Sequence, residues 1–151
     1  MDCERIFFIT SVTVQRRPIF RRDDAAELLI STLAHYRDAG KFLLHEFVVM
    51  PDHLHLLITP AGDISLERAM QFIKGGFSFR FKHGPGWQAS FTNHRVRDEE
   101  DYARHQEYIW MNPVRALLVE RAEKYRWSSA AGRMRLDPVP QGLKPRSSLA
   151  S

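Results

Sequence analysis

MPDHLHLLITP, residues 50–60, is the most informative stretch of the chain, because it places two histidines two positions apart on a predicted buried strand. Successive side chains of a strand point to opposite faces, so His53 and His55 share one face with Leu57. The other face is wholly apolar and consists of Leu54, Leu56 and Ile58. Two neutral imidazoles on one rigid strand form a preformed pair of metal ligands. Taken alone, the pattern also fits histidines that are hydrogen-bonded or face solvent.

Hydrophobic periodicity around this stretch predicts alternating strands and helices. Pro51-Asp52 reads as a two-residue turn between antiparallel strands, and Ser65 as a helix cap. In chain order we predict a strand over 6–14, a helix from 23 or 24 to 40, strands over 42–50 and 53–59, a helix from 65 through the glycines at 75 and 76, a strand over 87–96, and a helix from 98 to about 111. Asn112-Pro113 is expected to disturb the last helix, because a proline disfavours helical dihedrals in the residue before it.

This order predicts an α+β fold, a ferredoxin-like split β-α-β-β-α-β unit with an antiparallel sheet and an added C-terminal helix that carries Tyr108. In this topology the first and third strands are central and the first two helices cover one face of the sheet. The imidazoles of His53 and His55 then lie on the opposite face. We expect one domain over residues 1–131 and a flexible tail over 132–151, where prolines, glycine and serines occur without an apolar period.

Charge and composition restrict the function classes. The 151 residues include 22 Lys and Arg against 18 Asp and Glu, a net charge of +4 and a pI near 9.5. The arginines are clustered, which suits a phosphate backbone, although a solvated Arg-rich surface fits the charge equally well. Cys3 is the only cysteine, which excludes an intrachain disulfide. No signal-peptide pattern or bilayer-length apolar run is present, so we expect a cytoplasmic protein with no membrane partner.

Tyr108 and Asn112 are four residues apart and share one helix face while the helix persists. If that face covers the histidine side of the sheet, the phenol and the amide oxygen can meet His53 and His55. Two nitrogens and one oxygen suit Mg²⁺ or Mn²⁺ and leave positions open for water and a phosphate. From spacing alone, a packing tyrosine and a turn-forming asparagine remain open alternatives.

Five ordered motifs carry a family resemblance: FVVMPDHLHLL (47–57), WQxxF (87–91), HRVRDExDY (94–102), YIxxNPVRA (108–116) and YRWSS (125–129). Together they resemble the HUH single-tyrosine transposases, specifically the REP-associated tyrosine transposase branch. The resemblance implies that residues 1–131 form the catalytic domain. It further implies that His53, His55 and Asn112 bind a divalent metal, Mg²⁺ or Mn²⁺, and that Tyr108 is the nucleophile. Two departures are Leu117, where the family usually has glycine, and the Gly75-Gly76 pair.

The implied function is a metal-dependent single-stranded DNA endonuclease and strand transferase that forms a 5′-phosphotyrosine at sites flanked by a hairpin. The partner would be single-stranded DNA, with a homodimer that exchanges the tyrosine helix as an open possibility. Residues expected to contact the DNA are Arg16, Arg17, Arg21, Arg22, His94, Arg95, Arg97 and Arg115. The alternatives are a non-catalytic ferredoxin-like nucleic-acid-binding module or domesticated transposase, and a replication-initiator or relaxase type of HUH nuclease.

The remaining histidines have weaker claims as metal ligands. With a two-residue turn between its strands, the hairpin register puts His55 opposite Val48 and His45 opposite Ile58. His45 would then lie on the core side, while Glu46 would be either a partner of His55 or a solvated charge. The others, His35, His83, His94 and His105, have no geometric case as ligands.

Overall fold

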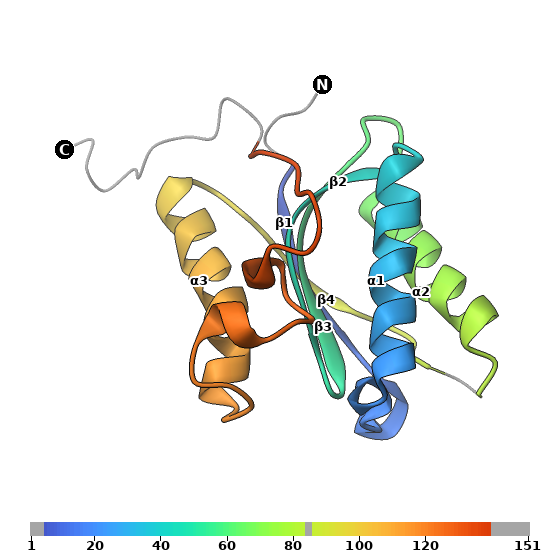
Figure 1. Ribbon diagram of the computed structural model, residues 1–151. Helices are drawn as coiled ribbons and strands as arrows, with labels where there is room; N and C mark the ends of the chain where they lie inside the picture. Colours follow the sequence, from blue (N-terminus) through green and yellow to red (C-terminus); the bar gives the residue numbers. More distant parts are fainter. Residues whose placement is uncertain (1–4, 84–85, 140–151) are drawn as a thin grey trace.

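Four strands form one antiparallel sheet in the computed structural model, which describes residues 5–83 and 86–139 (Figure 1). The strands are β1 (Phe7–Val12), β2 (Phe42–Met50), β3 (His53–Pro60) and β4 (Thr92–Arg95). Their order across the sheet is β2-β3-β1-β4, so that β1 and β3 are central, as predicted. The α+β class and the ferredoxin-like topology are therefore confirmed.

Helices cover both faces of the sheet. α1 (Asp23–Asp38) and α2 (Leu66–Phe81) lie on one face, and α3 (Glu99–Arg115) lies on the other (Figure 1). Ser65 and Asp98 cap α2 and α3, because each side chain accepts a hydrogen bond from the backbone N–H three residues later. The short 3₁₀ turns are η1 (Val14–Arg16), η2 (Ile19–Arg21), η3 (Ala122–Lys124) and η4 (Ser129–Ala131). None of the helices in the described ranges has the length and apolar character needed to span a membrane.

Alternation along β3 separates two apolar cores. The larger core lies between the sheet and α1 and α2 and includes the predicted face of Leu54, Leu56 and Ile58. The smaller core lies under α3, where Leu57 packs with Val48 and Ile109. Both faces of the central strand are therefore buried, which fixes the direction of its histidines.

Two elements differ in length from the prediction. β4 covers only four residues, and Trp87 lies outside it, in a single isolated bridge to Thr13 just after β1. The Trp87 ring packs against Phe20 and Phe77. α3 does not break at Asn112-Pro113 but continues to Arg115. Proline removes only one helical hydrogen bond, and Pro113 is itself buried, so packing against the sheet outweighs the local preference.

The glycine pair of α2 does not interrupt the helix. A Cβ at Gly76 would lie 2.6 Å from the Tyr36 ring, so this glycine allows α1 and α2 to approach closely. Leu117, which follows α3, adopts a φ of +62° and is 91% exposed. The bend therefore keeps the left-handed conformation that glycine would favour.

A β-bulge at His45 changes the pairing of β2 with β3. Val48 pairs with His55 as predicted, but Leu44 rather than His45 lies opposite Ile58. Glu46 lies opposite Leu57 and faces α3, as the regular register predicts. The extra residue turns His45 to the same side, toward Tyr102. The predicted core-side position of His45 is therefore wrong, because a bulge was not visible in the alternating pattern.

The C-terminal residues that the structure describes cover the outer edge of β2. Val49 N–H donates to the Trp127 carbonyl at 2.8 Å, and Asp137 N–H donates to the Leu44 carbonyl at 2.8 Å. Residues 132–139, which we placed in the tail, thus pack on the sheet, and 140–151 lie outside the described residues. This cover satisfies backbone groups that an open edge would expose.

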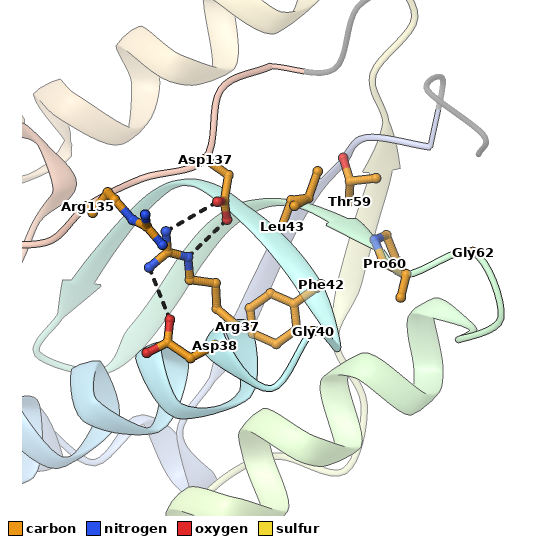
Figure 2. Close-up of a pocket in the computed structure, with 11 residues that line it drawn as sticks. Arg37, Asp38, Gly40, Phe42, Leu43, Thr59, Pro60, Gly62, Arg135 and Asp137 are labelled. Atoms are coloured by element: carbon orange, nitrogen blue, oxygen red, sulfur yellow. Dashed lines mark hydrogen bonds and ion pairs between the residues drawn. The ribbon is translucent and has the colours of Figure 1, made fainter.

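A buried ion pair holds this segment in place. Arg37 Nε and a terminal nitrogen donate to the Asp137 carboxylate at 3.1 and 3.2 Å (Figure 2). The same carboxylate accepts from Leu44 N–H at 2.8 Å. Burial raises the pKa of Asp137, but the hydrogen bonds and charge of Arg37 lower it more, so the carboxylate stays ionised.

We predict that Asp137→Ala lowers the free energy of unfolding by about 2–4 kcal/mol, since it leaves the buried Arg37 charge and the Leu44 N–H without their main acceptor. Urea denaturation measures the change. The control is Glu27→Gln, which breaks an exposed pair with Arg133 and should cost less than about 1 kcal/mol. Equal effects of the two substitutions would contradict the docked position of the segment.

Candidate active site

His55 lies buried under α3, where it is 4% exposed. Its Nδ1 lies 2.9 Å from the hydroxyl of Thr10, the residue that pairs with it on β1. Its Nε2 is buried and has no hydrogen-bond partner among the described residues. Burial, helped by the neighbouring His53, lowers the pKa of His55 to about 3, so the ring is neutral at physiological pH. With the proton on Nδ1, His55 presents an unused Nε2 lone pair.

His53 is oriented in the same way at the start of β3. Its Nδ1 lies 2.7 Å from a carboxylate oxygen of Asp52, and its ring centroid is 4.7 Å from that of His55. The other Asp52 oxygen accepts from Arg16 at 3.0 Å. Burial raises the pKa of Asp52, but its bonds to His53 and Arg16 lower it more. In both imidazoles Nδ1 is therefore hydrogen-bonded to a protein partner, as is usual for metal-ligating histidines.

The donors fit a divalent metal ion. The unsatisfied Nε2 of His55 is an atom whose burial is costly unless something binds it. Asn112 reaches the same place from α3, since it lines a pocket together with His53 and Asp52. Two imidazole nitrogens and one amide oxygen form a mixed donor set that suits Mg²⁺ or Mn²⁺.

Tyr108 lies beside this pair. Its ring is edge-on to His55, with centroids 5.3 Å apart, and the Arg115 guanidinium lies 5.4 Å from the ring centre. Phe8 stacks on His55 and meets Tyr108 edge to face, so it fixes the two rings relative to each other. Tyr108 is 42% exposed, which leaves it accessible to a substrate.

The other three tyrosines, all of them in the described residues, are unsuited to attack a substrate. Tyr36 stacks on Phe72 on the far side of the sheet. Burial and the charge of Glu46 raise the pKa of Tyr102. Burial raises the pKa of Tyr125 to about 12, and its hydroxyl donates to the Val49 carbonyl at 2.7 Å. Tyr108 therefore combines exposure with contact to the histidine pair.

A buried carboxylate connects β2 to α3. Glu46 is 7% exposed and accepts hydrogen bonds from the Gln106 amide at 2.9 Å, the Trp110 indole at 2.8 Å and the Ser129 hydroxyl at 2.6 Å. It is therefore neither solvated nor a partner of His55, and both interpretations of its place in the sequence are wrong. Because Gln106 and Trp110 flank Tyr108 on α3, Glu46 sets the height and rotation of the tyrosine helix.

Three of the predicted DNA-binding arginines gather around this site. Arg16 and Arg21 line the pocket with His53 and Asn112, and Arg115 lies against Tyr108. Arg95 does not join them, because it projects from β4 over Phe7 on the α1 and α2 side of the sheet.

Arg17 and Arg22 make local contacts. Arg17 donates to Gln15, and Arg22 donates to both carboxylate oxygens of Asp24. Both arginines flank η2, close in sequence to the pocket but outside its lining.

His94, Asp101 and His105 form a second cluster, with ligand atoms within 4.8 Å of one another. The expectation that these histidines have no geometric case as ligands is therefore wrong. Asp101 already accepts from His94 Nε2 at 2.7 Å, Arg97 N–H at 3.0 Å and Arg104 at 3.2 Å. Burial raises the pKa of Asp101 and these bonds lower it more. A carboxylate with two adjacent arginines is a poorer cation site than the histidine pair.

Sequence reasoning missed three residues of the site: Phe8, Thr10 and Asp52. Pairing of β1 with β3 puts Thr10 opposite His55, and Phe8 lies on the same face of β1 as Thr10. Because neither strand's own pattern encodes this cross-strand register, the sequence carried no direct signal for these two residues. Asp52 could have been found because it directly precedes His53.

Comparison with known proteins adds a family relationship. A sequence model described as "Transposase IS200 like" matches residues 6–111. The REP-associated tyrosine transposase of Escherichia coli is 32% identical over 89 residues, which are 58% of this chain and 54% of that protein. A candidate REP-associated tyrosine transposase of Haemophilus influenzae is 27% identical over 142 residues, 82% of this chain and 78% of that one. The chain thus spans about half the length of the Escherichia coli relative it matches.

Two solved structures are similar in fold. A REP-associated tyrosine transposase bound to a REP hairpin superposes with a TM-score of 0.74 and 25% identity, covering 95% of this chain and 88% of that chain. A candidate transposase of Deinococcus radiodurans gives a TM-score of 0.54 and 23% identity, covering 69% of this chain and 87% of that one.

The neutral state of His55 predicts a pH dependence of stability in metal-free buffer. An unfolded histidine binds a proton below about pH 6.5, whereas His55 in the fold does so only near pH 3. Acidification from pH 6.5 toward pH 4 therefore favours unfolding, by about 1.4 kcal/mol per pH unit for this group. Urea denaturation at several pH values should show that the free energy of unfolding changes less steeply with pH, by this amount, in His55→Gln than in the wild-type protein. Equal slopes would mean that His55 takes up a proton in the fold.

Proposed function

Because this chain belongs to the IS200-like transposase family, we propose that it cleaves and rejoins single-stranded DNA at hairpin-flanked sites through a covalent tyrosine intermediate. The observation that carries the proposal is the contact of Tyr108 with His55, whose buried Nε2 has no partner among the described residues. An exposed phenol beside an unsatisfied ligand atom is an arrangement for metal-assisted attack on a phosphodiester.

Tyr108 is the nucleophile in this proposal. Its phenolic oxygen loses its proton to solvent and attacks the phosphorus, and the P–O3′ bond breaks. The departing 3′ oxygen takes up a proton, which leaves a free 3′-hydroxyl and a 5′-phosphotyrosine. The new ester conserves the phosphodiester for rejoining, so no external energy source is required.

His53, His55 and Asn112 would hold the divalent ion, Mg²⁺ or Mn²⁺. The bound ion supplies a Lewis acid that offsets charge on the oxygens of the scissile phosphate. Asp52 and Thr10 keep the two imidazoles in the orientation that directs Nε2 to the site. Arg115, beside the Tyr108 ring, adds positive charge where the phenol becomes an anion.

The substrate would follow the arginines around the pocket. Arg16, Arg21 and Arg115 lie where a DNA backbone entering the site would pass, and Arg17 and Arg22 extend this line beyond η2. His94 and Arg97 lie farther along the α3 face, where both contact Asp101. The solved relative bound to a REP hairpin supports a hairpin substrate for this chain.

Tyr108 would act on the histidines of its own chain. α3 packs on its own sheet through Ile109 and through the bonds from Gln106 and Trp110 to Glu46. The outer edge of β2 is covered by residues 127–137, which leaves that edge unavailable for pairing with a second sheet. A homodimer is therefore not needed to build the site.

We predict that Tyr108→Phe still binds a labelled hairpin with a single-stranded flank but gives no protein-linked product with Mn²⁺ on a denaturing gel. Tyr36→Phe is the matched control and should form the adduct at the normal rate, because Tyr36 lies on the other side of the sheet. An adduct that persists in Tyr108→Phe would move the chemistry to another residue. Binding by the wild-type protein with no adduct would favour a non-catalytic DNA-binding module.

A second prediction concerns the arginines. Replacing Arg16, Arg21 or Arg115 by Gln should flatten the log–log salt dependence of single-stranded DNA affinity by about 0.7 for each phosphate that the protein no longer neutralises. Arg95→Gln is the matched control, because this residue projects from the other face of the sheet. Fluorescence anisotropy at four salt concentrations measures the slopes. The same slope in all four variants would contradict the proposed DNA path.

A further inference from the structure

α1 and α2 lie on the opposite side of the sheet from α3, the helix that carries Tyr108 (Figure 1). Their outer surface carries an aromatic groove. Phe79 is 80% exposed on α2, which is unusual for so large an apolar side chain. Phe72 lies nearly two turns before it and stacks on Tyr36, with ring centroids 5.2 Å apart. The three rings line one groove between the two helices. The Phe79 ring belongs to neither of the two apolar cores.

Positive charge surrounds these rings. The Arg68 guanidinium lies 4.7 Å and the Lys41 ammonium 5.2 Å from the centre of Phe72. Arg80 lines the groove beside Phe79, and among the described residues that line it none is acidic. Cations next to exposed aromatic faces are the combination that single-stranded nucleic acids bind, with phosphates on the cations and bases on the rings.

Gly75 lies in the groove, between Phe72 and Phe79 along α2. Packing explains Gly76, where a Cβ would meet Tyr36, but a Cβ at Gly75 would meet no described atom within 4 Å. A helix-interior glycine is unfavourable compared with alanine, so Gly75 weakens α2 without improving its packing. What the missing side chain does provide is an open groove between the two phenylalanines.

We propose that this groove is a second binding surface for single-stranded DNA, separate from the cleavage site. Bases stack on Phe79 and Phe72, while Arg68, Arg80 and Lys41 face the phosphates. The proposal rests on the proposed function for its ligand class, since a protein that cleaves a single strand beside a hairpin also has to hold the strand outside the cleaved step. The sheet separates the groove from Tyr108, so binding here does not require the chemistry.

The test measures binding of a fluorescein-labelled 20-nucleotide oligothymidine by anisotropy, in a Tyr108→Phe background that cannot cleave. Phe79→Leu should weaken binding roughly 5- to 150-fold, because leucine keeps the apolar volume and loses the stacking face. Phe79→Trp is the matched control and should retain the affinity. Arg80→Gln should flatten the salt slope by about 0.7.

Gly75→Ala separates a binding role from a structural one. Alanine should raise the melting temperature, because it is the better helix former, and should weaken oligothymidine binding by filling the groove. Unchanged affinity in both Gly75→Ala and Phe79→Leu would overturn the proposal. A concentration-dependent molecular mass that Phe79→Leu abolishes would also overturn it, by making the groove a contact between copies of the chain.

Cleavage separates this proposal from the proposed function. With Tyr108 restored, Phe79→Leu should form the covalent adduct with a short hairpin at the wild-type rate. If the groove does not bind DNA, the wild-type protein still forms that adduct. Failure of the proposed function would remove the adduct from the wild-type protein while leaving the binding measurements interpretable.

Discussion

Burial of both faces of β3 is the constraint on which the rest of the structure depends. The strand is central, with β2 and β1 bonded to its two edges and an apolar core on each side. Its leucine face packs under α1 and α2, which forces the alternate positions toward α3. The histidines are therefore rigid before any ligand arrives, and a shift of one residue in register would move them into the larger core.

The second requirement is that α3 sits at a defined height above these histidines. Glu46 supplies it, because its position opposite Leu57 faces α3, where one buried carboxylate accepts from Gln106, Trp110 and Ser129. Ser129 belongs to the segment that covers the β2 edge, and its hydroxyl also accepts from Phe47 N–H. The tyrosine helix, the sheet edge and the C-terminal segment are thus joined at one side chain.

Strand order, the separation of the two β3 faces and the family resemblance could all be predicted from the sequence, because they follow from period-two alternation and contiguous motifs. The bulge at His45 could not, since one extra residue leaves the apolar pattern of β2 intact. Continuation of α3 through Pro113 depends on tertiary packing that overrides a local preference. Thr10 reaches His55 only through pairing of strands 45 residues apart, which single-strand patterns do not encode. The arginines were predicted as one set, yet Arg95 lies on the other face because strand alternation also governs charged residues.

Anomalous X-ray diffraction from crystals soaked in Mn²⁺ tests the central claim most directly, because it locates the ion without relying on activity. We predict one strong peak within bonding distance of the Nε2 atoms of His53 and His55, on the side of β3 that faces Asn112. A peak among His94, Asp101 and His105 with none at the β3 histidines would contradict the assignment of this pair as the metal site.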